Sequence, residues 1–334
     1  MRDLASEFAA ERDHLTSVAY RMLGSRADAE DAVQDAWLRC SAALGDPEAR
    51  ARIRDLRAWL TTTVGRICLD MLRSARVRRE AYVGQWLPEP VVSRLAGTGA
   101  VATVAGPVAP GIAGAAGGFA PDPAERAALR EDLGLALLVV LERLTPEQRV
   151  AFVLHDVFAV PFEEIAEVLG ATPAAARQLA SRARRAVADG GPRHTADLAE
   201  QRRVLAAFLA ATESGDIERL VAVLAPDVVM IGDGGGLAPA ARRPVSGAIQ
   251  VARFVLGLLR RAQKETEVLG AELVLVNGAL GFLVEGDYRG DQRLRMVIAF
   301  AIDSGRITGI FDQVNPTKLA RVAALDSNAV WPPL

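Results

Sequence analysis

A short arginine-rich stretch between residues 173 and 185 carries side chains that could recognise nucleic acid. An arginine guanidinium can donate two hydrogen bonds to O6 and N7 of guanine, and a glutamine amide pairs similarly with adenine. Outer arginines on the same helix suit phosphate oxygens. The small residues 174–176 would let this helix end approach a surface closely. The residues expected to contact DNA here are Arg177, Gln178, Ser181, Arg182, Arg184 and Arg185.

The elements that must position this stretch form a helix-turn-helix. Apolar residues recur at helical spacing from 165 to 169, and Gly170 ends that first helix. Thr172 is a good N-cap, and Pro173 suits the first position of a second helix. The connection of about three to four residues is the length used by DNA-reading helix-turn-helix motifs. The alternative interpretation is an arginine-rich helix that is only solvated.

A second polar surface is predicted on a helix near the N-terminus, where acids crowd residues 28–35. Asp31 and Asp35 are four residues apart, and like charges at this spacing weaken a helix unless a basic group meets them. For Asp28, in the first turn, the helix dipole alone explains an acid. The docking face expected for a basic partner consists of Asp28, Asp31, Gln34 and Asp35.

Length and composition limit the class of protein. A chain of 334 residues has room for about two or three domains, because single cores stop growing near about 250 to 300 residues. The net charge of -2 conceals arginine-rich segments at 73–79 and 177–185. Cys40 and Cys68 are too few for a disulfide framework, so we expect a cytoplasmic protein. The charged N-terminus lacks a signal peptide's apolar core, and the apolar run 133–141 is too short to span a membrane.

The order of these segments resembles a bacterial extracytoplasmic-function (ECF) RNA polymerase sigma factor. A third helix is predicted over residues 56–80, with an apolar side and arginines at its end. The stretches that carry the resemblance are RMLGSRADAEDAVQDAWLR, RAWLTTTVGRICLDMLRSARVRRE and the helix-turn-helix. The first two are similar to sigma region 2, and the last is similar to region 4.

This resemblance implies partners for each surface. The acidic helix would dock on the β′ coiled coil of core RNA polymerase, with the β subunit as a further contact. The last helix would read the minus-thirty-five element of promoter DNA. Aromatic and arginine side chains stack on unpaired bases, which suits the opened minus-ten strand. The residues placed near that strand are Trp59, Arg66, Arg73 and Arg76.

Residues 190–192 end the arginine-rich helix, and the sequence beyond predicts a further domain. Helices are expected at residues 204–211, 217–224 and 248–261, and strands at 228–231, 267–276, 280–285, 294–302 and 307–312. Turn signals at 277–278 and 303–305 join the later strands. Helices followed by a curled antiparallel sheet make an α+β cone, which resembles the SnoaL-like, nuclear-transport-factor-two-like fold.

The expected fold class is therefore multidomain, with two all-α sigma domains followed by an α+β cone. The predicted boundaries are 1–80 for region 2, 81–126 for a linker with an extended WLPEP segment and a Gly/Ala-rich tether, 127–190 for region 4 and 198–334 for the cone.

Three short motifs resemble those of ECF sigma factors fused to a SnoaL-like domain. They are WLPEP in the linker, DGGG in the cone and NPTKL near the C-terminus. In that group the extra domain is understood to control the sigma domains in cis. Leu237 and Thr317 stand where the group commonly has Lys and Asp, which puts an ionic contact through those positions in doubt, whereas Lys318 remains. The residues expected to regulate are Trp86, Leu87, Pro88, Asp233, Gly234, Gly235, Gly236, Asn315, Pro316, Lys318 and Leu319.

Catalysis in the cone would need an inward-facing base with an oxyanion donor beside it. The candidates are Asp227, Asp233, Glu285, Asp287 and Tyr288, none of which forms a recognisable pair, and the predicted strands contain no His. We therefore expect no enzyme activity, no cofactor and no metal.

Two other classes of protein stay open at this point. One is a one-component helix-turn-helix regulator with a ligand-sensing cone, and the other is a SnoaL-like cyclase or isomerase tethered to a DNA-binding arm. A small-molecule ligand of unknown identity in the cone is kept as a further partner.

Overall fold

In the computed structural model the described residues are 4–80, 82–95, 134–189, 191, 193–290 and 292–325, with the backbone alone for 75–80. They fall into two units, each described here by itself. The helical unit comprises residues up to 81 and 138–191, and the sheet unit comprises 82–137 and 192 onward. The Gly/Ala-rich stretch predicted as a tether lies outside the described residues. The four boundaries expected from the sequence stay predictions.

The first part of the helical unit contains the helices α1 (Leu4–Leu23), α2 (Arg26–Leu44), α3 (Pro47–Arg52) and α4 (Leu56–Glu80). The helices α1, α2 and α4 pack on one another around fully buried side chains such as Leu15, Met22 and Leu60. Ser25 caps α2, because its Oγ accepts a hydrogen bond from the Asp28 N–H at 3.2 Å. Asp46 caps the short helix α3, because its side chain accepts a hydrogen bond from the Glu48 N–H at 3.2 Å.

The second part contains residues 138–141 of α6 (Leu135–Leu141), whose first three residues are assigned to the sheet unit. It also contains α7 (Pro146–Phe152), the π-helix η2 (Val153–Val157), α8 (Phe162–Leu169) and α9 (Pro173–Asp189). Thr145 and Gln148 form a capping box at the start of α7. Gly170 ends α8 in the left-handed conformation, at φ 61°, and Thr172 accepts a hydrogen bond from the Ala175 N–H. The helix-turn-helix predicted from the sequence is confirmed.

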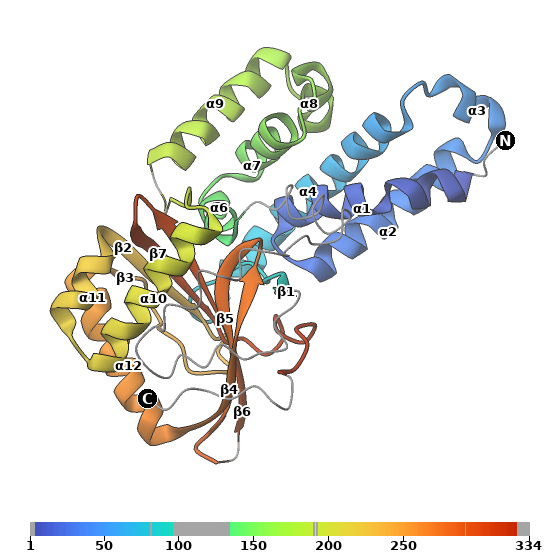
Figure 1. The fold of residues 1–334 in the computed structure, drawn as a ribbon. Helices are drawn as coiled ribbons and strands as arrows, with labels where there is room; N and C mark the ends of the chain where they lie inside the picture. The colour runs from blue at the N-terminus through green and yellow to red at the C-terminus, as the bar shows by residue number, and fades with distance from the viewer. Residues whose placement is uncertain are drawn as a thin grey trace. The chain divides into compact units, whose positions relative to one another are not determined.

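The sheet unit contains a seven-stranded sheet in the order β1-β4-β5-β6-β7-β2-β3. Its strands are β1 (Val92–Arg94), β2 (Leu224–Asp233), β3 (Val245–Ser246), β4 (Thr266–Val276), β5 (Ala279–Tyr288), β6 (Gln292–Asp303) and β7 (Arg306–Gln313). Its helices are α10 (Leu198–Ser214), α11 (Ile217–Val223) and α12 (Ala248–Glu265), which lie together on one side of the sheet (Figure 1). Apolar side chains from these helices and from the strands form the core on that side.

The expectation of a wholly antiparallel sheet was wrong at one place. The strands β4 to β7 form antiparallel hairpins, but β2 runs parallel to β7, with Met230 beside Ile310. Turn signals such as Asn277-Gly278 fix pairing between strands that follow one another directly. They carry no information about β2, which reaches the sheet before α12.

The linker contributes a strand that the sequence did not predict. Ser93 of β1 pairs antiparallel with Leu275 of β4, so this short strand forms an edge of the sheet. The pairing continues at Asn277, whose N–H donates to the Val91 carbonyl at 2.8 Å and whose Oδ1 accepts from the Val91 N–H at 3.1 Å. The start of the linker is therefore part of the sheet unit. No helix among the described residues is long and apolar enough to cross a membrane.

Candidate functional site

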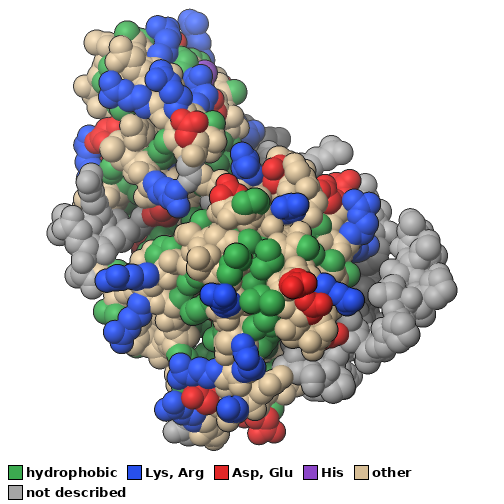
Figure 2. All heavy atoms as spheres, turned by 90° about the vertical axis from the view of Figure 1, so that its left-hand side faces the viewer, with side chains coloured by type: hydrophobic (Ala, Val, Ile, Leu, Met, Phe, Trp, Pro, Cys, Tyr) green, Lys and Arg blue, Asp and Glu red, His purple; other side chains and the backbone are tan. Residues whose placement is uncertain are grey.

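The helix α9 presents a polar face away from the core of its unit. Ala176, Ala180 and Ala183 are fully buried, so the side of the helix they share faces inward. The predicted DNA-contacting residues are exposed except for Ser181, which is half-buried. Basic side chains gather over the part of the helical unit that holds α9 (Figure 2).

Two of these arginines already contact carboxylates of the same unit. Arg177 lies 3.1 Å from Glu163, and Arg184 lies 2.9 Å from Asp156. Exposed pairs of this kind contribute about 0 to 1 kcal/mol, so DNA phosphates could readily replace them. Gln178 and Arg182 make no side-chain hydrogen bond or ion pair within the described residues.

The acidic face of α2 is open. Asp31, Gln34 and Asp35 are exposed and make no side-chain hydrogen bond or ion pair with the described residues. Asp28 is half-buried in the first turn, where the helix dipole favours an acid. The geometry leaves three of the four predicted docking residues available to a partner.

Two of the four predicted strand-contacting residues of α4 are engaged with the second part of the helical unit. Arg66 donates a hydrogen bond to the Glu167 carbonyl in α8 at 2.7 Å, and Arg73 forms an ion pair with Glu147 in α7 at 3.0 Å. Partial burial alone would raise the pKa of Glu147, but backbone and Arg73 hydrogen bonds lower it below its ordinary value. Trp59 is half-buried, and the side chain of Arg76 lies outside the described residues.

A buried arginine that the sequence reasoning missed reinforces this contact. Arg149 of α7 is 3% exposed and donates to the Met22 carbonyl at the end of α1 and to the Leu141 carbonyl, while its guanidinium also pairs with Glu142. Burial lowers the pKa of Arg149 to about 9. Charged groups are rarely buried without partners, so Arg149 ties the two parts of the helical unit together.

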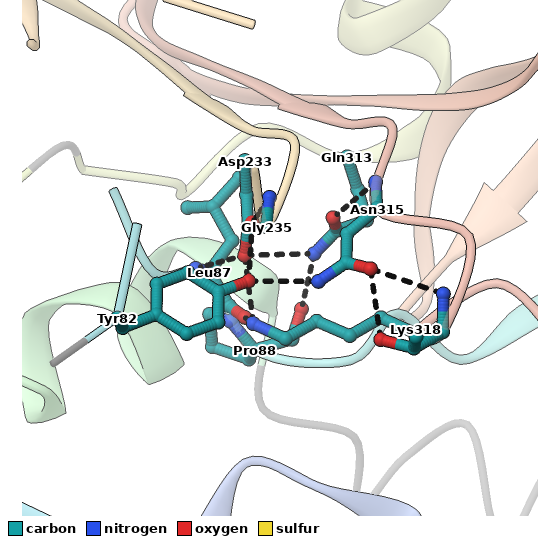
Figure 3. A network of polar contacts seen from close by, with 9 residues as sticks. Tyr82, Leu87, Pro88, Asp233, Gly235, Gln313, Asn315 and Lys318 are labelled. Carbon is teal, nitrogen blue, oxygen red and sulfur yellow. Dashed lines mark hydrogen bonds and ion pairs between the residues drawn. The ribbon is translucent and has the colours of Figure 1, made fainter. Parts of the chain in front are cut away.

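The three motifs singled out in the sequence meet in one polar cluster, shown in Figure 3 and called here the Asp233 network. Its members are Tyr82, Leu87, Pro88, Asp233, Gly235, Gln313, Asn315 and Lys318. Asp233, at the end of β2, is fully buried. Its carboxylate accepts hydrogen bonds from Tyr82 Oη at 2.6 Å, from the Leu87 N–H at 2.8 Å and from the Gly235 N–H at 3.0 Å.

Lys318 supplies the countercharge. Its Nζ lies 2.7 Å from Asp233 Oδ2 and donates to the Leu87 carbonyl at 2.6 Å. The ammonium also lies over the Trp86 ring, 4.1 Å from its centroid, and 5.0 Å from the Tyr82 centroid. One lysine thus contacts the linker through a carbonyl and two aromatic rings, and the cone through a buried carboxylate.

Asn315 links the C-terminal motif to the same cluster. Its Nδ2 donates to Tyr82 Oη at 2.7 Å, and its Oδ1 accepts from the N–H and the hydroxyl of Thr317 at 3.0 and 2.8 Å. Thr317 therefore stabilises the turn without a charge. Burial and the hydrogen bond to Asp233 raise the pKa of Tyr82, so this phenol remains a donor.

The glycines of DGGG allow the close approach of these segments. Gly235 has a φ of 59°, and a Cβ on it would lie 2.3 Å from Asn315 Nδ2. Gly236 has a φ of 74°, and a Cβ there would lie 3.0 Å from Val83 of the linker. Leu237, the departure from the group's motif, is 57% exposed. Glycine is needed both for the backbone conformation and for the space.

The other predicted regulatory residues flank the cluster. Leu87 and Leu319 are buried, and Pro88 is buried beside the cone. A Cβ on Gly234 would lie 2.1 Å from the Ala238 carbonyl oxygen. Pro316 is exposed.

The carboxylates considered for catalysis do not assemble into one site. Asp227 is exposed, Asp233 belongs to its network, and Glu285 is held by Arg293 and Arg295. Asp287 pairs with Arg293, and Tyr288 donates to Glu265. Groups of three or more metal-ligating side chains are absent from the described residues.

Comparison with known proteins agrees with this architecture. Residues 8–78 match the family described as Sigma-70 region 2, and residues 134–187 match Sigma-70, region 4. The chain is 45% identical over 325 residues to the ECF RNA polymerase sigma factor SigJ of Mycobacterium tuberculosis, covering 94% of this chain and 92% of that protein. It is 33% identical over 317 residues to the probable ECF RNA polymerase sigma factor SigI of the same species, covering 95% and 94%.

The chain therefore belongs to the ECF RNA polymerase sigma factors. Within that family it is of the SigJ type, with a C-terminal SnoaL-like domain. The crystal structure of Mycobacterium tuberculosis SigJ matches it with a TM-score of 0.69 and 42% identity, covering 95% of this chain and 98% of that one.

Proposed function

We propose that this sigma factor binds core RNA polymerase and promoter DNA to start transcription, and that its sheet unit controls this activity in cis through the linker. The observation that carries the proposal is the attachment of the linker to the cone. Residues 82–95 are held both by the Asp233 network and by strand β1.

The surfaces of the helical unit support the first part of the proposal. The open carboxylates of Asp31 and Asp35 suit a basic surface on the polymerase β′ coiled coil. The exposed face of α9 suits the major groove of the minus-thirty-five element, with Gln178 and Arg182 free to contact base edges. In this proposal Trp59, Arg66, Arg73 and Arg76 contact the opened minus-ten strand.

The second part of the proposal, control in cis, is supported by the contacts of the chain on either side of the helix-turn-helix segment. Chain segments on both sides of residues 138–191 belong to the sheet unit. Before them, Tyr82 and Leu87 bond to Asp233. After them, the Thr195 N–H donates to the Ile302 carbonyl at 3.0 Å, and His194 accepts from the Ile302 N–H at 3.1 Å. The proposed DNA-reading part of the chain is thus flanked, before and after it in the sequence, by segments that bond to the cone.

The contacts of α4 indicate what this restraint favours. Arg66 and Arg73 bond to Glu167 and Glu147 of α8 and α7, so they are occupied while the two parts of the helical unit stay together. Separation of the two parts would free these arginines for DNA. We propose that the anchored linker holds the resting state in which they remain occupied.

Truncation of the chain after about Pro192 tests control in cis. We expect promoter-dependent transcription by core polymerase to rise, because the linker then has no cone to bind. A fall would mean that the sheet unit assists rather than restrains, and an unchanged transcript yield would refute control in cis.

A further inference from the structure

Asp312 of β7 is a buried carboxyl that the Asp233 network does not use. It is 7% exposed, and its Oδ1 is enclosed with no hydrogen-bond partner. Its side chain makes no hydrogen bond or ion pair within the described residues. An unpaired buried carboxyl costs free energy, so its presence calls for a physical reason.

The strand register places Asp312 on the helix side of the sheet. It lies opposite Ile298 of β6 and beside Gly232 of β2. Residues paired across neighbouring strands share a face, and Ile298 packs against the core formed with α10, α11 and α12. Asp312 therefore points into the cone.

The cone is filled unevenly along its strands. One row across the sheet is buried throughout and consists of Leu275, Leu280, Phe300, Ile310 and Met230. The next row, toward the other end, consists of Leu273, Phe282, Ile298, Asp312 and Gly232. In this second row Leu273, Phe282 and Ile298 are only partly buried although they face the helices. The apolar lining of the cone is thus reachable from solvent in the row that holds Asp312.

One end of this row is closed by the chain that follows β2. A Cβ on Gly232 would lie 3.2 Å from the Ala241 N atom, so residues 240–241 lie directly against this glycine. At its other side, Phe282 meets Phe300 of the buried row edge to face, with centroids 5.9 Å apart. Asp312 therefore lies between Ile298, which separates it from the aromatic pair, and Gly232, which is covered by residues 240–241.

Charged groups on the elements around Asp312 are turned elsewhere. Glu285 on β5 pairs with Arg293 and Arg295 of β6 on the opposite face, and Asp233 on β2 pairs there with Lys318. The other acids of these strands and of α12 also pair or are exposed: Asp287 pairs with Arg293, Asp303 with Arg193 and Glu265 with Arg261, and Asp227 is exposed. The remaining basic residues are exposed and are Arg306 on β7, Arg242 and Arg243 after β2, and Arg253, Arg260, Arg261 and Lys264 on α12. Burial raises the pKa of Asp312 to about 7.

We propose that Asp312 is the polar contact of a binding site for a small, neutral, largely apolar ring compound whose hydroxyl group donates a hydrogen bond to the carboxyl. Partly buried Leu273, Phe282 and Ile298 provide apolar surface for the body of the ligand, and Oδ1 provides an acceptor that has no donor within the described residues. Ligand sites combine such apolar lining with a few polar groups that fix orientation.

Because the hydroxyl of the ligand donates the hydrogen bond, the direction in which the affinity changes with pH can be predicted. A hydrogen bond to a carboxyl oxygen favours the charged form. A hydroxyl-bearing ligand therefore lowers the pKa of Asp312, and its affinity rises as the pH rises through about 7. The site is independent of control in cis, since ligand binding can be measured without polymerase.

Equilibrium dialysis of the full-length protein against 2-naphthol and 2-methoxynaphthalene tests this inference, because the two probes differ in the donor. We expect saturable binding of 2-naphthol, with a preference over the methoxy probe of about tenfold, the value of one hydrogen bond. Asp312→Leu should abolish that preference while the methoxy probe binds as before. Asp312→Asn should retain the preference and lose its pH dependence.

Asp227→Asn is the matched control, since Asp227 is an exposed carboxylate of the same sheet, and it should bind both probes like the wild type. Circular dichroism checks that each variant is folded. Three outcomes would overturn the inference: no saturable binding of 2-naphthol to the wild type, an equal loss of both probes in Asp312→Leu, or a preference that Asp312→Leu leaves intact.

Discussion

At the scale of single residues, Asp233 and Lys318 dominate the contact between linker and cone. The carboxylate is fully buried and accepts four hydrogen bonds, from Tyr82, Leu87, Gly235 and Gln313, besides the ion pair at 2.7 Å. A buried charge is tolerated because its partners replace the water it has lost. Removal of one partner is therefore costly in free energy.

Lys318→Ala should lower the free energy of unfolding of the sheet unit by about 2 to 3 kcal/mol, somewhat below the usual cost of breaking a buried ion pair, because Asp233 keeps its other donors. Urea denaturation and hydrogen exchange at the Leu87 amide measure this. Lys264→Ala is the matched control, since Lys264 is exposed. A Lys318→Ala protein as stable as Lys264→Ala, with Leu87 still protected, would contradict the account of the network.

At the scale of elements, the acidic face of α2 and the basic face of α9 each lie on a helix whose other side is buried. Asp31 and Asp35 lie on the side of α2 opposite its buried residues, such as Ala29 and Ala36. The helix is thus stable without them, and they remain available for a partner.

Asp31→Arg combined with Asp35→Arg should prevent co-purification with core RNA polymerase while leaving helix content unchanged, because repulsion replaces attraction at a basic surface. Arg39, exposed on the same helix, offers the control variant Arg39→Ala, which should still co-purify. Pull-down with purified core enzyme measures both. Undiminished binding of the double variant would exclude the acidic face as the docking surface.

How much could be predicted from the sequence also depends on the element. Helix α4 has the bounds expected from its periodicity, 56–80, and the helix-turn-helix followed from Gly170 and Thr172. Local signals of this kind are read from neighbouring residues. The pairing of β1 with β4 and of β2 with β7 joins distant segments, and no local pattern encodes it.

The candidate site likewise contains residues that were predicted from the sequence and residues that were not. The motifs around Trp86, Asp233 and Asn315 were recognised, because glycines and an Asn-Pro turn stand out in the sequence. Asp312 was missed because a single acid in an apolar strand gives no sign of its face until the register is known. The contacts of Arg66 and Arg73 could not be foreseen either, since they join segments more than seventy residues apart.

At the scale of the whole molecule, the linker is joined to the helical unit through the chain and bound to the cone through hydrogen bonds, an ion pair and strand pairing. The linker follows the first helices of the helical unit in the chain, and its residues Tyr82 and Leu87 bond to the cone. Region 4 lies between two attached segments. In the proposed function, the cone controls promoter recognition through these segments, without a separate inhibitor protein.

Promoter-dependent transcription by core polymerase with Asp233→Asn tests this claim most directly. Asp227→Asn on the same strand β2 is the control, because that carboxylate is exposed. The account predicts a higher transcript yield for Asp233→Asn than for the wild type, with Asp227→Asn unchanged and binding to core enzyme equal in all three proteins. Equal yields from a folded Asp233→Asn protein whose linker has been released, as shown by loss of Leu87 amide protection, would contradict it.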